Sequence, residues 1–108
     1  MESAEAPVYF LVLATDGPGL ARIRTETRPS HRAYLRNPGP HAVRVHLGGP
    51  TLTTDGNEMN GTLLVVEAQS LEDVTEFVAD DPYSRAGLFA SVVVRPWSWT
   101  LGAPESRP

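Results

Sequence analysis

Three histidines and a pair of adjacent aspartates are the residues best suited to move a proton near neutral pH. His31 shares a helical face with Tyr34 and Leu35, three and four residues on, so its ring can point inward. An imidazole beside a carboxylate is a standard general base, because the carboxylate fixes the tautomer and stabilises the imidazolium that forms. Asp80 or Asp81 could supply that carboxylate, and spacing does not choose between them. The plainer alternative is a surface histidine and acidic residues that only mark a turn.

A metal or a cofactor is not expected. His41 and His46 lie five residues apart across the start of a strand, and no acidic residue near them is an obvious support for a metal ligand. The chain has no cysteine, which excludes disulfides, thiolate catalysis and zinc sites with sulfur ligands. Gly17 and Gly19 follow a strand, but their spacing fits neither the dinucleotide nor the P-loop pattern.

All nine cationic residues are arginines, and five of them fall between residues 22 and 36. Guanidinium groups suit carboxylates, so this cluster could bind an anionic substrate, although a solvated helix face is the plainer interpretation. Arg28 and Arg32, which flank His31, are the best candidates for substrate contacts. The net charge of −4 argues against non-specific binding to nucleic acid, which needs a basic face.

One domain must position these residues, because 108 residues make a single core. We expect strands at 8–14, 43–47, 62–68 and within 88–97, and helices at 29–36 and from Ser70 to about residue 79. Because proline breaks a helix interior, the segment before Pro29 is expected to be ragged. Alternation in the second strand predicts that Val43, Val45 and Leu47 are buried. A leader (1–7), a mobile loop (51–60), a connection (83–87) and a tail (98–108) complete the chain.

The order β-α-β-β-α-β predicts a ferredoxin-like α+β sandwich, with helices on one face of the sheet. The unbroken apolar strands make the other face apolar as well, so it must be covered. Two such sheets meeting face to face would form a dimeric α+β barrel. Burying a few hundred Å² at ~25 cal/mol per Å² contributes ~10 kcal/mol before association costs, so we expect a homodimer.

A family resemblance rests on five stretches that occur in order along the chain: RPSHRAYL (28–35), VHLGGP (45–50), GTLLVVEA (61–68), DDPYSRAGL (80–88) and VVVRPW (92–97). Together they resemble the YCII family of YciI-like proteins over residues 8–97. No stretch is decisive alone, but five in the right order are a specific signal.

The resemblance implies a dimeric α+β barrel with a histidine–aspartate dyad in a pocket between helices and sheet. Carried over to this chain, the catalytic pair is His31 and Asp81, and Pro82 shapes the loop that presents Asp81. Thr62 stands where the family often has serine, which keeps the hydroxyl but narrows the pocket by a methyl group. His46, on the polar face of its strand, could line this pocket or face water.

The best understood activity that the resemblance implies is a dehydrochlorination, the elimination of HCl from a chlorinated hydroxyhydroquinone. We therefore expect a small cofactor-free enzyme, of lyase or isomerase type, that uses the dyad for proton transfer on a small cyclic, oxygenated metabolite. The alternatives are a non-catalytic dimer that binds a small ligand or a partner, and an accessory subunit of a larger enzyme.

A cytoplasmic protein without a membrane partner is expected. The first five residues lack the basic start of a signal peptide. The longest apolar run, residues 8–14, is far shorter than the ~20 residues of a membrane span.

Overall fold

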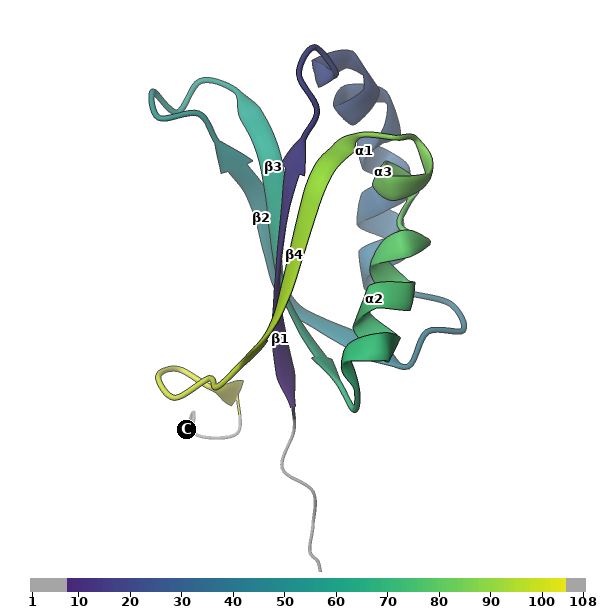
Figure 1. Ribbon diagram of the computed structural model, residues 1–108, viewed down its shortest axis with the longest axis vertical. Helices are drawn as coiled ribbons and strands as arrows, with labels where there is room; N and C mark the ends of the chain where they lie inside the picture. The colour runs from purple at the N-terminus through teal and green to yellow at the C-terminus, as the bar shows by residue number, and fades with distance from the viewer. Residues whose placement is uncertain (1–7, 105–108) are drawn as a thin grey trace, which may run out of the picture.

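A computed structural model describes residues 8–104 as one layer of sheet and one layer of helices (Figure 1). The strands are β1 (Tyr9–Asp16), β2 (Val43–Leu52), β3 (Met59–Ala68) and β4 (Phe89–Trp97), and the helices are α1 (Ala21–Arg36), α2 (Leu71–Ala79) and α3 (Pro82–Arg85). The sheet has the order β2-β3-β1-β4, and every neighbouring pair is antiparallel. This is the predicted ferredoxin-like α+β fold. The expected leader and the last four residues of the expected tail lie outside the described residues.

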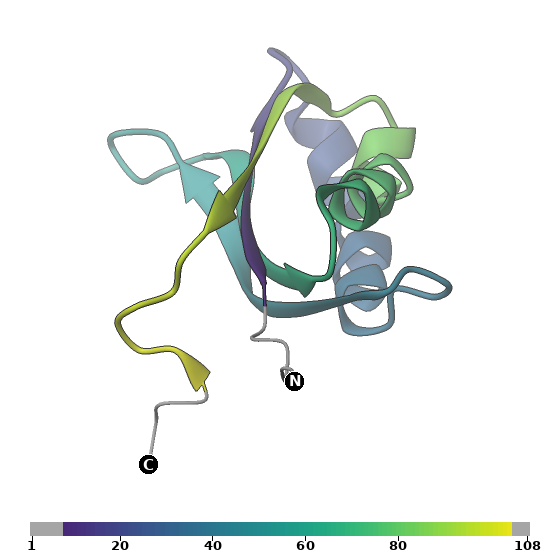
Figure 2. The ribbon, with the colours of Figure 1, turned by 60° about the horizontal axis from the view of Figure 1, so that its bottom comes forward.

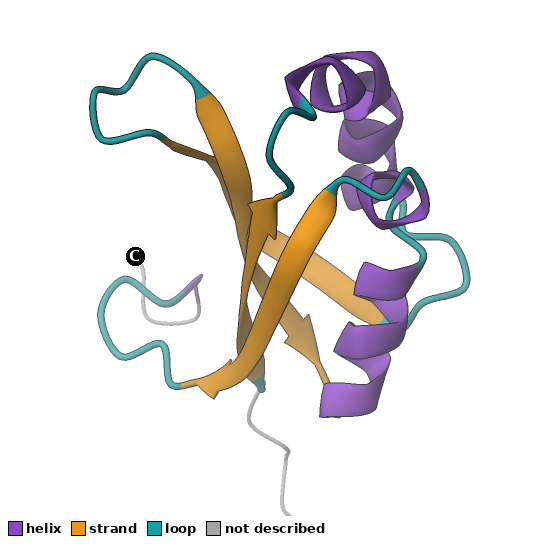
Figure 3. Ribbon diagram, turned by 45° about the horizontal axis from the view of Figure 1, so that its top comes forward, coloured by secondary structure: helices purple, strands orange, loops and turns teal. Residues whose placement is uncertain are grey.

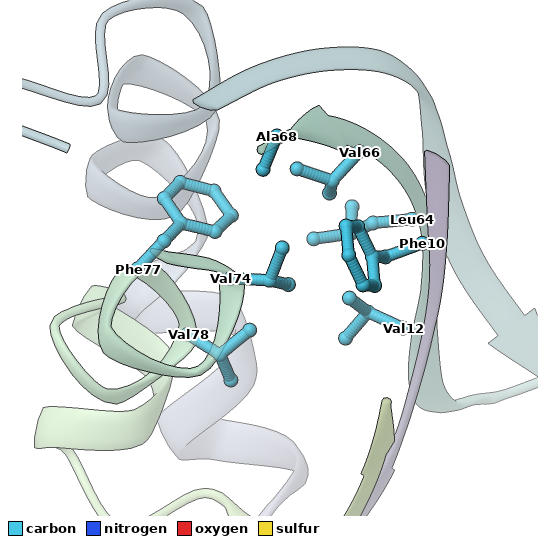
Figure 4. Close-up of a cluster of buried hydrophobic side chains, with 8 residues drawn as sticks. All are labelled: Phe10, Val12, Leu64, Val66, Ala68, Val74, Phe77 and Val78. Atoms are coloured by element: carbon cyan, nitrogen blue, oxygen red, sulfur yellow. The ribbon is translucent and has the colours of Figure 1, made fainter. Parts of the chain in front are cut away.

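The hydrophobic core lies between the sheet and α2 (Figure 4). Side chains alternate along β1 and β3, so every second one points to the helices. The cluster consists of Phe10, Val12, Leu64, Val66, Ala68, Val74, Phe77 and Val78. As predicted, Ser70 caps α2, since its hydroxyl oxygen accepts from the backbone N–H of Asp73 at 3.1 Å.

The first helix corrects our expectation of a ragged segment before Pro29. α1 runs without interruption from Ala21 to Arg36, with the proline inside it. An interior proline removes one hydrogen bond and costs ~3 kcal/mol. Here Arg24 and His31, the two buried residues of α1, lie on either side of Pro29 and are both held by carboxylates. These tertiary contacts outweigh the local preference.

The second strand corrects two further predictions. β2 does not end at residue 47 but continues through Gly48-Gly49-Pro50 to Leu52. It is an edge strand, and an edge strand tolerates a proline that donates no hydrogen bond. A register shift between Val45 and Leu47 makes His46 an extra residue in the strand. Leu47, which we expected to be buried, therefore turns to the other face and is 51% exposed.

The segment expected to be a mobile loop, residues 51–60, contains the end of β2, the start of β3 and the turn between them, residues 53–58. Its turn is closed by the backbone N–H of Thr53, which donates to the carbonyl of Glu58 at 2.8 Å. The carboxylate of Asp55 accepts from the Thr53 hydroxyl at 2.6 Å and from the Asn57 N–H at 3.0 Å. The expected connection at 83–87 is also partly regular, because its first three residues belong to α3 (Pro82–Arg85).

Both helices of the split βαβ pattern cover the same face of the sheet, and none of the helices α1 to α3 within residues 8–104 lies on the other face (Figure 2). After β4 the chain bends over one end of this second face, where the Trp99 ring packs against Tyr9 and His46. Farther along the sheet, Leu13, Leu63 and Val93 are exposed. None of the helices within residues 8–104 is long and apolar enough to cross a membrane.

Candidate active site

His31 and Asp81 are fifty residues apart in the chain and are hydrogen-bonded in the structure. Nδ1 of His31 lies 2.8 Å from Oδ1 and 2.9 Å from Oδ2 of Asp81. The two residues are 5% and 2% exposed. A carboxylate only accepts, so Nδ1 carries the hydrogen and Nε2 is left to face a ligand. Within residues 8–104, Nε2 has no hydrogen-bond partner.

The start of α3 holds Asp81 in place. Pro82 occupies the first turn of this helix, and Asp81 is its N-cap. The same Oδ1 atom that binds His31 also accepts from the backbone N–H of Tyr83 at 2.8 Å. Pro82 does not line the pocket, and it follows Asp81 directly in the first turn of α3.

Tyr83 stacks on the imidazole of His31, with ring centroids 4.0 Å apart and planes inclined by 19°. It is fully buried, and burial raises the pKa of its phenol, although the positive charges of Arg24 and Arg28 oppose this. The guanidinium of Arg24 lies 4.6 Å from the centroid of the tyrosine ring. Because its pKa is raised, the phenol stays protonated at neutral pH. The stacking of its ring fixes the plane of the imidazole.

Arg24 is a buried cation that links three elements of the site. Its guanidinium donates two hydrogen bonds to Asp16, at 2.7 and 3.0 Å, and one to the Thr62 hydroxyl at 2.8 Å. Burial alone would lower the pKa of Arg24, but the hydrogen bonds and the charge of Asp16 outweigh it and raise the pKa. Arg24 is 4% exposed and stays charged, so it supplies a fixed positive charge at the end of β1 and β3.

Thr62 lies in the pocket wall, and its hydroxyl oxygen accepts a hydrogen bond from Arg24. The residue before it must be glycine. A Cβ on Gly61 would collide with the carbonyl oxygen of Ala14 and with the Thr51 hydroxyl. Gly61 thus allows β1 and β2 to close around β3 at the level of the site.

A pocket of about 730 Å³ opens between α1 and β2, and His31, Thr62 and Tyr83 lie in its wall. The size suits a small molecule. Figure 3 shows the two elements that border it, α1 among the helices and β2 at the edge of the sheet. The remaining lining residues include five arginines: Arg24, Arg28, Arg32, Arg36 and Arg44. Arg28 and Arg32, which we singled out, are among them.

His46 also borders the pocket, but its ring is occupied elsewhere. Nε2 of His46 lies 2.7 Å from Oε1 of Glu67, and the ring packs edge-on against Tyr9 and Trp99. These partners belong to the sheet face without helices. The carboxylate of Glu67 corrects our expectation that no acidic residue stands near His46.

Asp80, the alternative partner of His31, binds a different histidine. Nε2 of His41 lies 2.8 Å from Oδ2 of Asp80, and Arg85 donates to Oδ1 at 2.6 Å. The hydrogen bond from His41, with the charge of Arg85, lowers the pKa of Asp80. The two adjacent aspartates therefore face two separate histidines. Within residues 8–104, no three His, Asp or Glu side chains gather closely enough to hold a metal ion.

Our sequence analysis missed Asp16, Arg24 and Tyr83. Asp16 was not among the candidate residues, and Arg24 was one of the five arginines for which a solvated helix face was the plainer interpretation. A signal was present, because Arg24, Arg28 and His31 recur at intervals of four and three residues and must share one helical face.

Comparisons with known proteins show the family and the fold of the chain. A family model for the YCII-related domain matches residues 8–98. The chain belongs to the YCII-related family. Two relatives in this family are Protein YciI of Escherichia coli, 28% identical over 95 residues, and an uncharacterised protein of Haemophilus influenzae, 26% identical over 95 residues. Each alignment covers 83% of this chain and 96% of the relative.

Among solved structures, the chain is similar to that of 5-chloro-2-hydroxyhydroquinone dehydrochlorinase (TftG) from Burkholderia phenoliruptrix AC1100, in complex with 2,5-dihydroxybenzoquinone. It is 38% identical, with a TM-score of 0.71, over 83% of this chain and 93% of that one. A protein of Arabidopsis thaliana, 21% identical with a TM-score of 0.54, covers 91% of this chain and 92% of its own, and shares the fold.

Proposed function

We propose that this YCII-related protein is an enzyme that uses His31 and Asp81 to transfer protons on a small cyclic, oxygenated compound, in an elimination of the dehydrochlorinase type. The observation that carries the proposal is the buried hydrogen bond of 2.8 Å between Asp81 and Nδ1 of His31, a histidine that lies in the wall of the pocket. The similarity to TftG supports the class of reaction.

In the proposed reaction, Nε2 of His31 takes the proton of a ring hydroxyl. The electron pair of the broken O–H bond forms a carbonyl, and the ring carbon that bears the leaving group takes up a proton and becomes tetrahedral. Loss of the proton of a second, conjugated hydroxyl then forms a second carbonyl, and the leaving group departs as an anion with its bonding pair. The products are the unsaturated carbonyl compound and one equivalent of acid, HX. Asp81 stabilises the imidazolium while it exists. No electron acceptor is needed, because the proton and the anion leave together.

Thr62 and Arg24 fit the same reaction. The Thr62 hydroxyl oxygen accepts a hydrogen bond from Arg24. The hydroxyl hydrogen therefore remains available to donate to a substrate oxygen. A donor polarised by a buried guanidinium would stabilise the negative charge that develops on that oxygen.

The proposed enzyme is a homodimer that pairs the sheet faces lacking helices. Leu13 lies between Leu63 of β3 and Val93 of β4 in the registers of the two ladders. All three side chains are exposed and form one apolar row across the sheet. A second copy would bury this row, as the family resemblance implies.

The test is chloride release from 5-chloro-2-hydroxyhydroquinone by the purified protein. We expect turnover by the wild type and loss of about 10²–10⁴-fold in rate for His31→Gln, the usual share of general-base catalysis. Thr75→Ala, an exposed change on α2, is the control. A wild-type protein that binds 2,5-dihydroxybenzoquinone without releasing chloride from the substrate would favour a binding protein or a different leaving group.

A further inference from the structure

The pocket has a strong excess of positive charge that proton transfer alone does not require. Of the residues in its wall, five are arginines and none is aspartate or glutamate. The chain as a whole has a net charge of −4. A concave surface lined by one sign of charge focuses the field and concentrates ligands of the opposite sign.

Four of these five arginines lack a counter-charge within residues 8–104: three lie on α1, and the fourth, Arg44, lies on β2. Arg24 forms an ion pair with Asp16, and Arg22, outside the pocket, is paired with Glu26 at 2.9 Å. In contrast, Arg28, Arg32 and Arg36 form no ion pair or side-chain hydrogen bond within residues 8–104. We call these three the arginine row.

The spacing of the row carries an energetic cost. Its members follow one another at intervals of four residues, directly after Arg24, so like charges face each other along one side of α1. Such pairs destabilise an isolated helix. A ligand anion that lies along the row would remove this repulsion.

The row extends from the dyad toward the far end of the pocket. Arg28 stands one turn before His31, and its charge acts on the phenol of Tyr83. Arg36 follows eight residues later, about 12 Å farther along the helix at 1.5 Å per residue. The pocket of about 730 Å³ has room for a ring at His31 and a substituent that reaches Arg32 and Arg36.

We propose that the substrate of this site is a cyclic compound with an oxyanion substituent, a carboxylate or a phosphate, that the arginine row binds while the reacting hydroxyl lies at His31. This inference rests on the proposed function for the placement of the ring. Guanidinium groups bind carboxylates and phosphates alike through paired hydrogen bonds. The carboxylate and the phosphate therefore need separate probes.

The test compares ligands that differ only in the anionic group, with binding measured by calorimetry or NMR titration at low salt. The pairs are 2,5-dihydroxybenzoate against hydroquinone and phenyl phosphate against phenol. We expect the anion of at least one pair to bind about tenfold more tightly than its neutral counterpart, a difference that one charge-assisted contact supplies. The pair with the larger ratio of affinities, anion over neutral compound, shows whether the site prefers a carboxylate or a phosphate.

Arg32→Gln and Arg36→Gln should each reduce this preference, and raising the salt concentration should reduce it as well. Arg22→Gln is the matched control, because it removes an arginine of the same helix that lies outside the pocket, and it should leave the preference unchanged. Equal affinities within both pairs, or an equal loss in Arg22→Gln, would overturn the proposal.

Binding and turnover separate this inference from the proposed function. If the wild type prefers the anions through the arginine row but no substrate is turned over, the proposed enzyme fails and the anion site stands. If chloride is released through His31 and neither pair shows a preference, the enzyme stands and the anion site fails.

Discussion

The imidazole of His31 is clamped between a carboxylate at its edge and an aromatic ring on its face. Asp81 binds Nδ1 at 2.8 Å, and the ring of Tyr83 lies parallel to the imidazole with centroids 4.0 Å apart. Tyr83 is tied in turn to Arg24, whose Nη1 lies 3.4 Å from the phenol oxygen. Proton transfer needs the imidazole in one orientation, and these contacts fix both its tautomer and its plane.

The first prediction separates the ring of Tyr83 from its hydroxyl. Tyr83→Phe keeps the stacking and should retain most of the activity. Tyr83→Ala leaves a cavity under His31 and should lower the free energy of unfolding by about 3–5 kcal/mol, as for other buried aromatic truncations. Urea unfolding measures the stability, and chloride release measures the rate. Equal rates for the two variants, on folded protein, would contradict a role of the ring in orienting His31.

The second prediction sets Asp81 against Asp80. Asp81→Asn keeps the shape of the N-cap of α3 but weakens the hold on the imidazolium, so the rate should fall severely. Asp80→Asn weakens the contacts with His41 and Arg85, away from the pocket, and should have a much smaller effect. Steady-state kinetics of chloride release compare the rates of the two variants with that of the wild type. If Asp80→Asn is the slower enzyme, the assignment of the dyad is wrong.

The third prediction concerns the ion pair between Arg24 and Asp16. Both side chains are buried, so Arg24→Met leaves a carboxylate without its counter-charge and should cost about 3–5 kcal/mol. Asp16→Leu together with Arg24→Met removes both charges and should recover much of that loss. A double-mutant cycle by urea unfolding measures the coupling. A double variant less stable than Arg24→Met would show that the carboxylate is supported by other groups.

Patterns along the chain predict most of the elements, since their causes are local. The alternation of apolar side chains marks the strands, and the hydroxyl of Ser70 marks the start of α2. The errors arise where tertiary contacts dominate. Pro29 remains inside α1 because carboxylates bind buried residues of the helix on both sides of it, and Pro50 remains in β2 because an edge strand does not need its N–H.

The site is less accessible to sequence reasoning, because its members meet only in three dimensions. His31 and Asp81 are separated by fifty residues, and only the family resemblance chose Asp81 over Asp80. Arg24 was placed on a solvated face because arginine is rarely buried. Its counter-charge comes from Asp16 at the end of β1, a residue that the sequence analysis did not single out.

The fourth prediction is an alkaline loss of stability through Tyr34. Its hydroxyl donates to the carbonyl oxygen of Phe77 at 2.6 Å, and burial, with the negative charges of Asp80 and Asp81, raises its pKa well above the usual range. The folded chain therefore favours the neutral phenol. This stabilisation is complete below about pH 10, the value of a free tyrosine, and is lost as the pH rises above it.

Tyr34→Phe is the matched variant for this test. It should cost ~1 kcal/mol at neutral pH, the net value of one hydrogen bond, and should then lose less stability than the wild type above pH 10. Urea midpoints from pH 7 to pH 11 give both values. Parallel pH profiles for the two proteins would show that Tyr34 ionises in the folded chain.

The last prediction concerns the apolar sheet face. Leu13, Leu63 and Val93 lie side by side in the ladders, and Val93 is 49% exposed in the single chain. Light scattering on the folded protein at micromolar concentration should give twice the chain mass of 11.7 kDa. Val93→Glu places a charge in the centre of the paired faces and should shift the protein to the monomer, because burying an unpaired carboxylate is costly. Thr75→Glu, on the exposed side of α2, adds the same charge away from that face and should leave the dimer intact. A wild-type mass equal to one chain would refute the pairing of sheet faces. A dimer that persists in Val93→Glu would move the interface to another surface.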